Sequence, residues 1–506
     1  MTAPYGAVST SHHLATEAGA DALRRGGNAI DAALAAAAAL CVVYPHNVAL
    51  GGDLVALVRS PDGDVRFLNA TGPAPTAQTL EVLRAKHGDA LPLRGIDAVT
   101  LPGGVCGWNS LHEHGARLSW AEHFDAAIRH AEGHPLARSV AEELIEDRAS
   151  FGRDPGGAAV FYPEGEPLAE GETLRQPALA ATLRRLAAGG SAEFYEGETA
   201  ERWIAGLQRL GSKLTMQDAR DYSAHWDDPL EGEFDGLRVL TSPPNTSGFI
   251  LLRALNAVAA GIEDPLGAGA GELARAFLAG NCVRAAALAD PRFGGASGEE
   301  LVAMSAPEGA VRGAPKASGD TVGLSAVSAD GWAVSLINSV YWGFGAHILE
   351  PETGIIFQNR GTAFSLDPAS PNAFAGGKRP RHTLMPVLVL DGEELAYVPA
   401  TMGGAAQPQI HAQLLLRQLR QGATPHEATH APRWSVGEPV GDGPVRVTAE
   451  VDVPAEALAA IRAAGFDLVT VERYSEELGH ANVIRVTPDG YDAASDPRSD
   501  GSAIVV

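Results

Sequence analysis

Two short β-type runs near the middle of the chain constrain its fold more than any other feature. The first runs from Thr321 to Val327 and the second from Trp332 to Ile337, and Ser328-Ala-Asp-Gly331 connects them. A short connection containing Asp-Gly between two such runs is typical of a β-hairpin. We therefore predict a hairpin that begins at Thr321, directly after the loop residues Gly319 and Asp320.

A threonine hydroxyl becomes a useful nucleophile only when a base lies beside it. The α-amine of an N-terminal threonine is such a base, because its pKa of about 7.7 to 8.0 leaves a fraction of it neutral near working pH. Thr321 could acquire this amine by scission of the Asp320-Thr321 bond, which its own hydroxyl could bring about by attacking the preceding carbonyl. The local pattern alone favours ordinary turn chemistry, so the hypothesis needs support from other motifs.

Motifs on both sides of the hairpin supply that support. Asp320-Thr321 is followed by Asp330-Gly331, Gly354-Ile-Ile-Phe-Gln-Asn359, Lys378-Arg-Pro380 and Met402-Gly-Gly404. In order and spacing these motifs resemble the small subunit of γ-glutamyltransferases, N-terminal-nucleophile hydrolases that cleave themselves before such a threonine. Thr100-Leu-Pro-Gly-Gly104 and Leu214-Thr-Met-Gln-Asp218 resemble the large subunit. The resemblance extends from about Gly26 to the C-terminus.

The resemblance implies an α+β fold, a four-layer αββα sandwich shared by two subunits. The large (α) subunit would comprise residues 1–320 and end in a flexible linker over 304–320, which is rich in Ala, Gly, Pro and Ser. The small (β) subunit would comprise residues 321–506. The expected product is an αβ heterodimer from one precursor, and pairing of two heterodimers stays open. No cofactor is implied.

The same resemblance assigns roles to residues of the catalytic site. Thr321 would be the nucleophile, and Ser339 takes the place of a threonine that supports it. The backbone N–H groups of Gly403 and Gly404 would stabilise the oxyanion, since glycine lets the backbone approach a developing charge. The simpler alternatives are a strand serine, an ordinary Gly-Gly turn and, for His480, a structural histidine.

The expected substrate pocket departs from the family pattern. Thr71 stands where the family has an arginine that clamps the substrate α-carboxylate, and Tyr341 replaces an asparagine. Arg360 and Ala363 replace two acidic residues that hold the substrate ammonium. The pair that binds the α-carboxylate, two serines in the family, is here His382 and Thr383.

These replacements remove two anionic groups and one arginine, and they add Arg360 and a protonatable His382. The pocket is therefore expected to offer positive charge only. We expect a small-molecule amide whose acyl group carries a carboxylate or a neutral polar end and no α-ammonium, hydrolysed or transferred through an acyl ester on Thr321. A solvated Arg360 that contacts no substrate is the simpler alternative.

Two other functions remain open at this point. The chain could be a true γ-glutamyltransferase or glutathione hydrolase that holds glutamate differently, or an uncleaved, inactive homologue that acts as a binding protein. The formal charge of -24 argues against nucleic acids and anionic membranes as partners. The sequence around Arg379-Pro-Arg381 is too short for nucleic-acid recognition and is expected to hold surface or ion-pair residues.

The N-terminal residues lack the basic and apolar regions of a secretion signal, so we expect a cytoplasmic protein. Cys41, Cys106 and Cys282 are widely spaced and have no metal-ligand spacing, which favours reduced thiols and no metal site. Apolar periodicity and end signals predict secondary structure beyond the first hairpin. The expected elements are helices over His13–Arg25, Ile30–Val43, Ala121–Glu132, Ile410–Gln421 and Pro454–Ala464, and a second hairpin formed by a strand ending at Val58 and a strand over Val65–Asn69.

Overall fold

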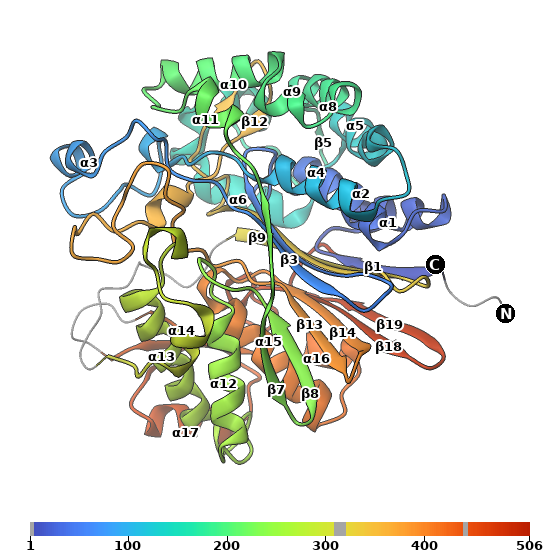
Figure 1. The fold of residues 1–506 in the computed structure, drawn as a ribbon, viewed down its shortest axis with the longest axis vertical. Coiled ribbons are helices and arrows are strands. Elements are labelled where there is room, and N and C mark those ends of the chain that lie inside the picture. The colour runs from blue at the N-terminus through green and yellow to red at the C-terminus, as the bar shows by residue number, and fades with distance from the viewer. Residues whose placement is uncertain (1–4, 308–319, 439–443) are drawn as a thin grey trace.

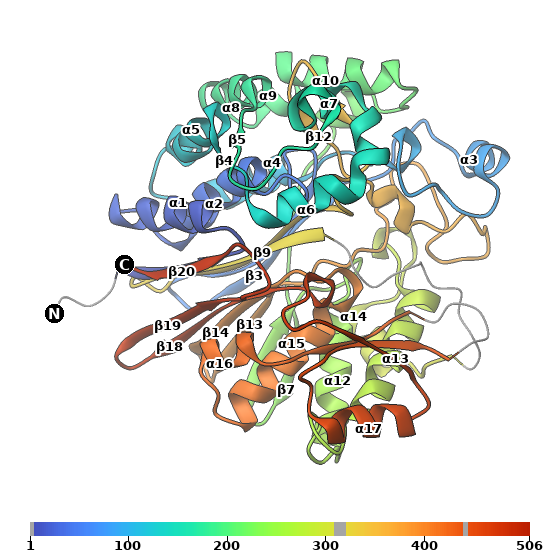
Figure 2. The ribbon, with the colours of Figure 1, turned by 180° about the vertical axis from the view of Figure 1, so that it is seen from behind.

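Two β-sheets lie face to face in the middle of the molecule, and helices cover the outer face of each (Figure 1). The computed structural model describes residues 5–307, 320–438 and 444–506. Seen from behind, the same four layers follow one another from top to bottom (Figure 2). This is the predicted αββα sandwich. Most of the predicted linker, residues 308–319, lies outside the described residues.

The first sheet contains seven strands within the described residues, and it combines strands from before and after Thr321. Their order across the sheet is β20 (Ser502–Val505), β1 (Gly6–Thr10), β9 (Asp320–Ser328), β10 (Ala333–Tyr341), β2 (Asp53–Arg59), β3 (Val65–Ala70) and β6 (His225–Asp227). Both predicted hairpins are present, since β9 pairs with β10 and β2 pairs with β3, each antiparallel. Thr321 is thus held near the start of a central strand.

The second sheet contains six strands in the described part of the chain. Their order is β19 (Gly490–Ser495), β18 (Ala481–Thr487), β14 (Glu394–Thr401), β13 (Val387–Asp391), β8 (Leu237–Thr241) and β7 (Leu230–Phe234). Smaller sheets are formed by β15 (Trp434–Val436), β16 (Arg446–Glu450) and β17 (Asp467–Val471), by β4 (His134–Pro135) with β5 (Thr173–Leu174), and by β11 (Leu349–Glu350) with β12 (Ile355–Ile356).

The helices divide between the two outer layers according to their position in the chain (Figures 1 and 2). Beside the first sheet lie α1 (His13–Arg24), α2 (Ala29–Val43), α4 (Gly104–Gly115), α5 (Asp125–Glu132), α6 (Arg138–Glu146), α7 (Pro155–Phe161), α8 (Pro177–Gly189), α9 (Ala192–Tyr195), α10 (Glu198–Arg209) and α11 (Met216–Arg220). Beside the second lie α12 (Phe249–Ala259), α13 (Ala270–Ala287), α14 (Gly298–Ala303), α15 (Gln407–Leu415), α16 (Pro425–His430) and α17 (Ala455–Ala463), while α3 (Leu80–His87) projects to one side.

The side chains of strand β2 pack into two apolar layers, one on each face of the sheet. Leu54, Ala56 and Val58 join the core under the helices, whereas Val55 and Leu57 join the core between the sheets. This follows from the alternation of side chains along a strand. All five residues are fully buried, so the strand is apolar on both faces.

Two predicted helices differ at their ends. Instead of a helix from Ala121, residues Trp120–Phe124 form a 3-10 turn, and α5 begins only at Asp125. Ser119 and Glu122 close a capping box on that turn, which fixes the chain one turn before the α-helix. The helix predicted from Ile410 begins earlier, at Gln407, and its last turn over Leu416–Arg420 is a π-helix.

Candidate active site

Thr321 lies buried beside Ser339 at an irregularity of the central hairpin. The pairing of β9 with β10 shifts between Asn338 and Tyr341, as in a β-bulge. Thr321 Oγ1 lies 2.9 Å from Ser339 Oγ. The Tyr341 N–H donates to Ser339 Oγ at 2.8 Å, and Tyr341 holds a φ of 86°, a value that favours glycine. The bulge thus directs the Ser339 hydroxyl at the hydroxyl of the candidate nucleophile.

Arg360 is the buried cation of this site. It begins a 3-10 turn over Arg360–Ala363 and is 0% exposed, so the alternative of a solvated arginine is wrong. Its Nη1 donates to Thr383 Oγ1 at 3.1 Å and its Nη2 to Ser339 Oγ at 3.4 Å. Its Cζ lies 3.8 Å from the ring centroid of Tyr341, a cation–π contact. Four predicted residues therefore meet next to Thr321.

No carboxylate among the described residues lies within 4.0 Å of the Arg360 guanidinium. Burial lowers its pKa to about 10, so the group remains charged at neutral pH. A buried charge without an ion pair is costly unless another charged group compensates it. A substrate carboxylate would supply that compensation.

Asp53 is a site residue that the sequence analysis missed. It begins β2, is 0% exposed and pairs in register with Ser339 of β10. Burial raises the pKa of its carboxyl group to about 7, although the positive charge of Arg360 opposes this rise. Its Oδ1 accepts from Gly72 N at 2.8 Å, Gln358 Nε2 at 2.9 Å and Gly103 N at 3.3 Å, and its Oδ2 lies 3.1 Å from His382 Nε2.

His382 is neutral, contrary to the expectation that it adds positive charge. Burial lowers its pKa well below the usual value, and Arg360 and Arg379 lower it further. The Leu384 N–H donates to Nδ1 at 3.4 Å, which places the ring proton on Nε2, facing Asp53. The expectation of positive charge alone is therefore wrong, because the pocket holds one arginine and one buried carboxyl group.

Thr71 adjoins the residues that contact Asp53 and His382. Within the described residues it makes no hydrogen bond to Arg360 or Thr321. Its Oγ1 donates to Asn69 Oδ1 at 2.7 Å and accepts from Asn245 Nδ2 at 3.5 Å. The Asn245 carbonyl also accepts the N–H of His382 at 2.7 Å. Thr71 thus belongs to a polar wall that orients His382.

The candidate oxyanion glycines follow β14, close to the start of β9. A Cβ added to Gly323 would lie 2.6 Å from Thr401 N, so the two strands approach as closely as glycine permits. Gly403 has a φ of 146° and Gly404 a φ of 50°, and a Cβ on Gly403 would lie 2.3 Å from Ile410 Cδ1. The backbone angle therefore favours glycine at position 403, and a larger residue there would also displace the end of the Ile410 side chain.

A buried ionic network is connected to this glycine loop by backbone hydrogen bonds. Arg433 pairs with Asp496 at 2.6 Å and donates to Gly479 O at 2.9 Å. His480 O in turn accepts the Met402 N–H at 2.8 Å. Burial lowers the pKa of the His480 side chain to about 4, which agrees with a structural rather than a catalytic histidine.

Metal-binding and membrane-spanning features are both absent from the described ranges. No three His, Cys, Asp or Glu side chains there are grouped so that they could hold a metal ion. No described helix is long and apolar enough to cross a membrane. The three cysteines form no disulfide.

Comparison with known proteins supports the expected family. The family model described as gamma-glutamyltranspeptidase matches residues 15–506. The oxamate amidohydrolase proenzyme of Klebsiella pneumoniae is 35% identical over 99% of this chain and 98% of its own length. A glutathione hydrolase-like proenzyme of Bacillus subtilis is 33% identical, with 98% of both chains covered.

The solved structures agree with the sequence comparison. The crystal structure of a cephalosporin acylase from Bacillus halodurans matches with a TM-score of 0.91 and 32% identity, covering 99% of this chain and 96% of that one. The shared fold is an N-terminal-nucleophile hydrolase sandwich. The chain therefore belongs to the gamma-glutamyltranspeptidase family of N-terminal-nucleophile hydrolases, enzymes that act on amide bonds.

Proposed function

We propose that the chain cleaves itself before Thr321 and then hydrolyses an amide whose short acyl group carries a carboxylate. The observation that carries this proposal is the position of Arg360. Its buried guanidinium contacts Ser339, which also contacts the Thr321 hydroxyl. A carboxylate on Arg360 would thus lie only a few atoms from the nucleophile, which favours the mono-amide of a small dicarboxylic acid.

Each step of the reaction has a candidate group. The freed α-amine of Thr321 accepts the hydroxyl proton as Oγ1 attacks the amide carbon. The N–H groups of Gly403 and Gly404 stabilise the oxyanion, the protonated amine then supplies a proton to the leaving amine, and an acyl ester on Thr321 results. Water activated by the same amine attacks the ester and releases the dicarboxylate.

The name of one relative supports this choice of acyl group, because oxamate is itself a mono-amide of a dicarboxylic acid. A solved relative is a cephalosporin acylase, which supports the hydrolysis of an amide. A γ-glutamyl group needs a partner for its α-ammonium, and Asp53, the described carboxyl group nearest Arg360 in this site, is enclosed by four hydrogen-bonding contacts. The pocket therefore suits a carboxylate without an α-ammonium.

A direct comparison of substrates tests the proposal. Purified, processed protein should release ammonia from oxamate, malonamate or succinamate, with the best chain length reporting the distance from Thr321 to Arg360. Turnover of γ-glutamyl-p-nitroanilide or glutathione should be at least about tenfold less efficient in kcat/KM. Efficient turnover of those γ-glutamyl compounds would instead support a true γ-glutamyltransferase with an altered pocket.

Asp53 predicts how substrate charge selectivity depends on pH. Below its pKa of about 7 the carboxyl group is neutral, and the field of Arg360 acts fully on a substrate carboxylate. As pH rises through that value Asp53 becomes negative and partly cancels this field. We expect the KM ratio of succinamate to butyramide to rise about threefold to tenfold between pH 6 and pH 8.

The Asp53→Asn variant isolates Asp53 from the α-amine, which titrates in the same range and whose charge also acts on a substrate carboxylate. This variant should show a low ratio whose change with pH is much smaller than in the wild-type protein. Asp31→Asn, which alters a buried carboxylate that caps α2, is the control and should keep the dependence. A pH dependence that persists undiminished in Asp53→Asn would contradict the assignment.

A further inference from the structure

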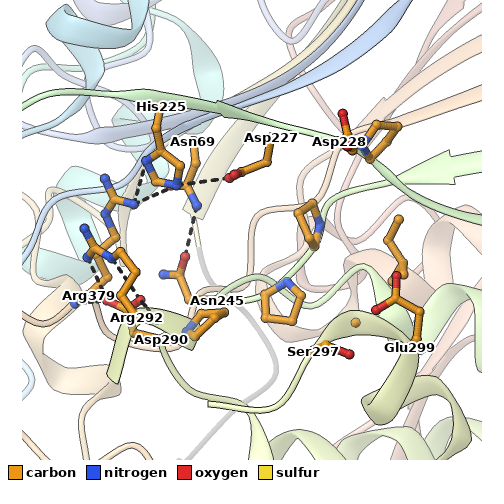
Figure 3. A pocket seen from close by; sticks show the side chains of 16 residues that line it. Asn69, His225, Asp227, Asp228, Asn245, Asp290, Arg292, Ser297, Glu299 and Arg379 are labelled. Atoms are coloured by element: carbon orange, nitrogen blue, oxygen red, sulfur yellow. Dashed lines mark hydrogen bonds and ion pairs between the residues drawn. The ribbon is translucent and has the colours of Figure 1, made fainter. Parts of the chain in front are cut away.

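A cleft of about 420 Å³ lies on the far side of the polar wall that contains Thr71. Asn69 and Asn245 form part of its lining, and Asn69 Nδ2 donates to Asn245 Oδ1 at 3.1 Å. Figure 3 shows Arg379, Arg292 and Asp290 at one end of the cleft and Asp228 and Glu299 at the other. The cleft thus has ends of different charge, and the two amides lie between them together with His225 and Asp227.

Arg379 is the unusual residue at the first end. Arg379 is only 3% exposed, so the expectation of an arginine on the surface or in an ion pair is wrong. Within the described residues its guanidinium has no carboxylate within 4.0 Å, and its Nε has no hydrogen-bond partner. Its Nη1 instead contacts the His225 ring, with 2.8 Å to Nδ1.

The neighbouring carboxylate does not neutralise Arg379. Asp290 pairs through both carboxylate oxygens with Arg292, at 2.7 and 3.1 Å. It also accepts the backbone N–H of Arg379 at 2.9 Å, and these donors hold its pKa below the usual value despite burial. Asp227 is similarly engaged, since its Oδ2 lies 3.1 Å from His225 Nε2. Arg379 lines the cleft with its charge uncompensated by a carboxylate, and an anionic group in the cleft would compensate it.

The opposite end offers two weakly paired carboxylates. The side chain of Asp228 is 89% exposed and has Arg66 at 3.5 Å. Glu299 lies in the first turn of α14, where its negative charge interacts favourably with the helix dipole. It forms no ion pair within the described residues. These groups add an attraction for a positive charge at the end away from Arg379.

We propose that this cleft binds a small zwitterion, with its carboxylate on Arg379 and its ammonium group toward Asp228 and Glu299. Free ω-amino acids with a chain of several carbons are the class of ligand that fits, because the two charges must reach opposite ends of the cleft. The site is separate from the acyl pocket, which uses Arg360. It adjoins that pocket through Asn245, whose carbonyl accepts the His382 N–H, so an occupant contacts the wall that orients His382.

Calorimetric titration of the full protein with 6-aminohexanoate tests this proposal, with hexanoate and hexylamine as ligands that carry one charge each. 6-Aminohexanoate should bind more tightly than either. Arg379→Gln should weaken 6-aminohexanoate binding at least about tenfold, because a charge-assisted hydrogen bond is lost. Arg360→Gln alters the other buried arginine and should leave 6-aminohexanoate binding unchanged.

A second variant guards against a folding defect in Arg379→Gln. The double variant Asp228→Asn and Glu299→Gln alters only the opposite end, and it should remove the preference for 6-aminohexanoate over hexanoate while hexanoate still binds. The proposal is overturned if the wild-type protein does not bind 6-aminohexanoate, if Arg360→Gln abolishes binding, or if the double variant keeps the preference. None of these readouts requires catalytic activity, so failure of the proposed reaction would be recognised separately.

Discussion

Thr321→Val should leave the chain as a single band of 52.4 kDa on a denaturing gel and lower amide hydrolysis on the order of 10⁴-fold or more. Valine keeps the β-branched shape that suits strand β9 and removes only the hydroxyl. Without that hydroxyl the Asp320-Thr321 bond is not attacked, so neither the new amine nor the nucleophile exists. The wild-type protein should instead give fragments 1–320 and 321–506, the second beginning Thr-Val-Gly-Leu.

Two further variants separate the hydroxyl from other effects. Thr321→Ser keeps the reacting group and should still be cleaved, with part of the activity retained. Ser339→Ala removes the hydroxyl 2.9 Å from Thr321 Oγ1, so it should slow cleavage and turnover, whereas Ser339→Thr should restore both. A wild-type chain that stays uncleaved yet folded would favour the alternative of a binding protein.

The fold could be predicted largely because its strongest signals are local. The hairpin β9–β10 and the helix α2 follow from turn chemistry and from a capped apolar run, and tertiary contacts only extend them. Residues Trp120–Phe124 were harder to predict, because a capping box at Ser119 and Glu122 fixes a 3-10 turn in a sequence that also suits a helix.

A site residue could be predicted only where it stands in the place of a family residue whose role is known. Arg360, Tyr341 and Ser339 meet as expected, because family motifs place them around the same strand ends. Asp53 was missed because its role depends on contacts with Gly72, Gln358 and His382, which are distant in sequence. A carboxylate opening an otherwise apolar, doubly buried strand is the signal that could have revealed it.

The neutral state of His382 could likewise not be predicted from the sequence. A histidine among arginines can be protonated on the surface, but burial and the charges of Arg360 and Arg379 lower the pKa of this ring. The charge of a pocket residue therefore depends on the burial of its side chain as much as on its residue type. This leaves Arg360 as the one group of the predicted pocket residues that carries a full positive charge at neutral pH.

Arg360→Gln should abolish the preference for acyl groups that carry a carboxylate. Removing one partner of a buried, hydrogen-bonded charge pair costs about 2 to 5 kcal/mol, which is roughly 30-fold or more in kcat/KM. Succinamate hydrolysis should fall by that factor, whereas hydrolysis of butyramide, which has the same chain without the charge, should change little. The ratio of the two kcat/KM values is the measurement.

A partly buried arginine controls for lost packing. Arg417 donates to the carbonyls of Gln413 and Pro432, away from Thr321, so Arg417→Gln should lower stability without changing the succinamate to butyramide ratio. Arg360→Lys should retain part of the selectivity, because it keeps the charge but loses the planar fork that reaches both Ser339 and Thr383. If Arg360→Gln keeps the full ratio, the guanidinium compensates Asp53 instead of the substrate, and the pocket must recognise its acyl group by shape.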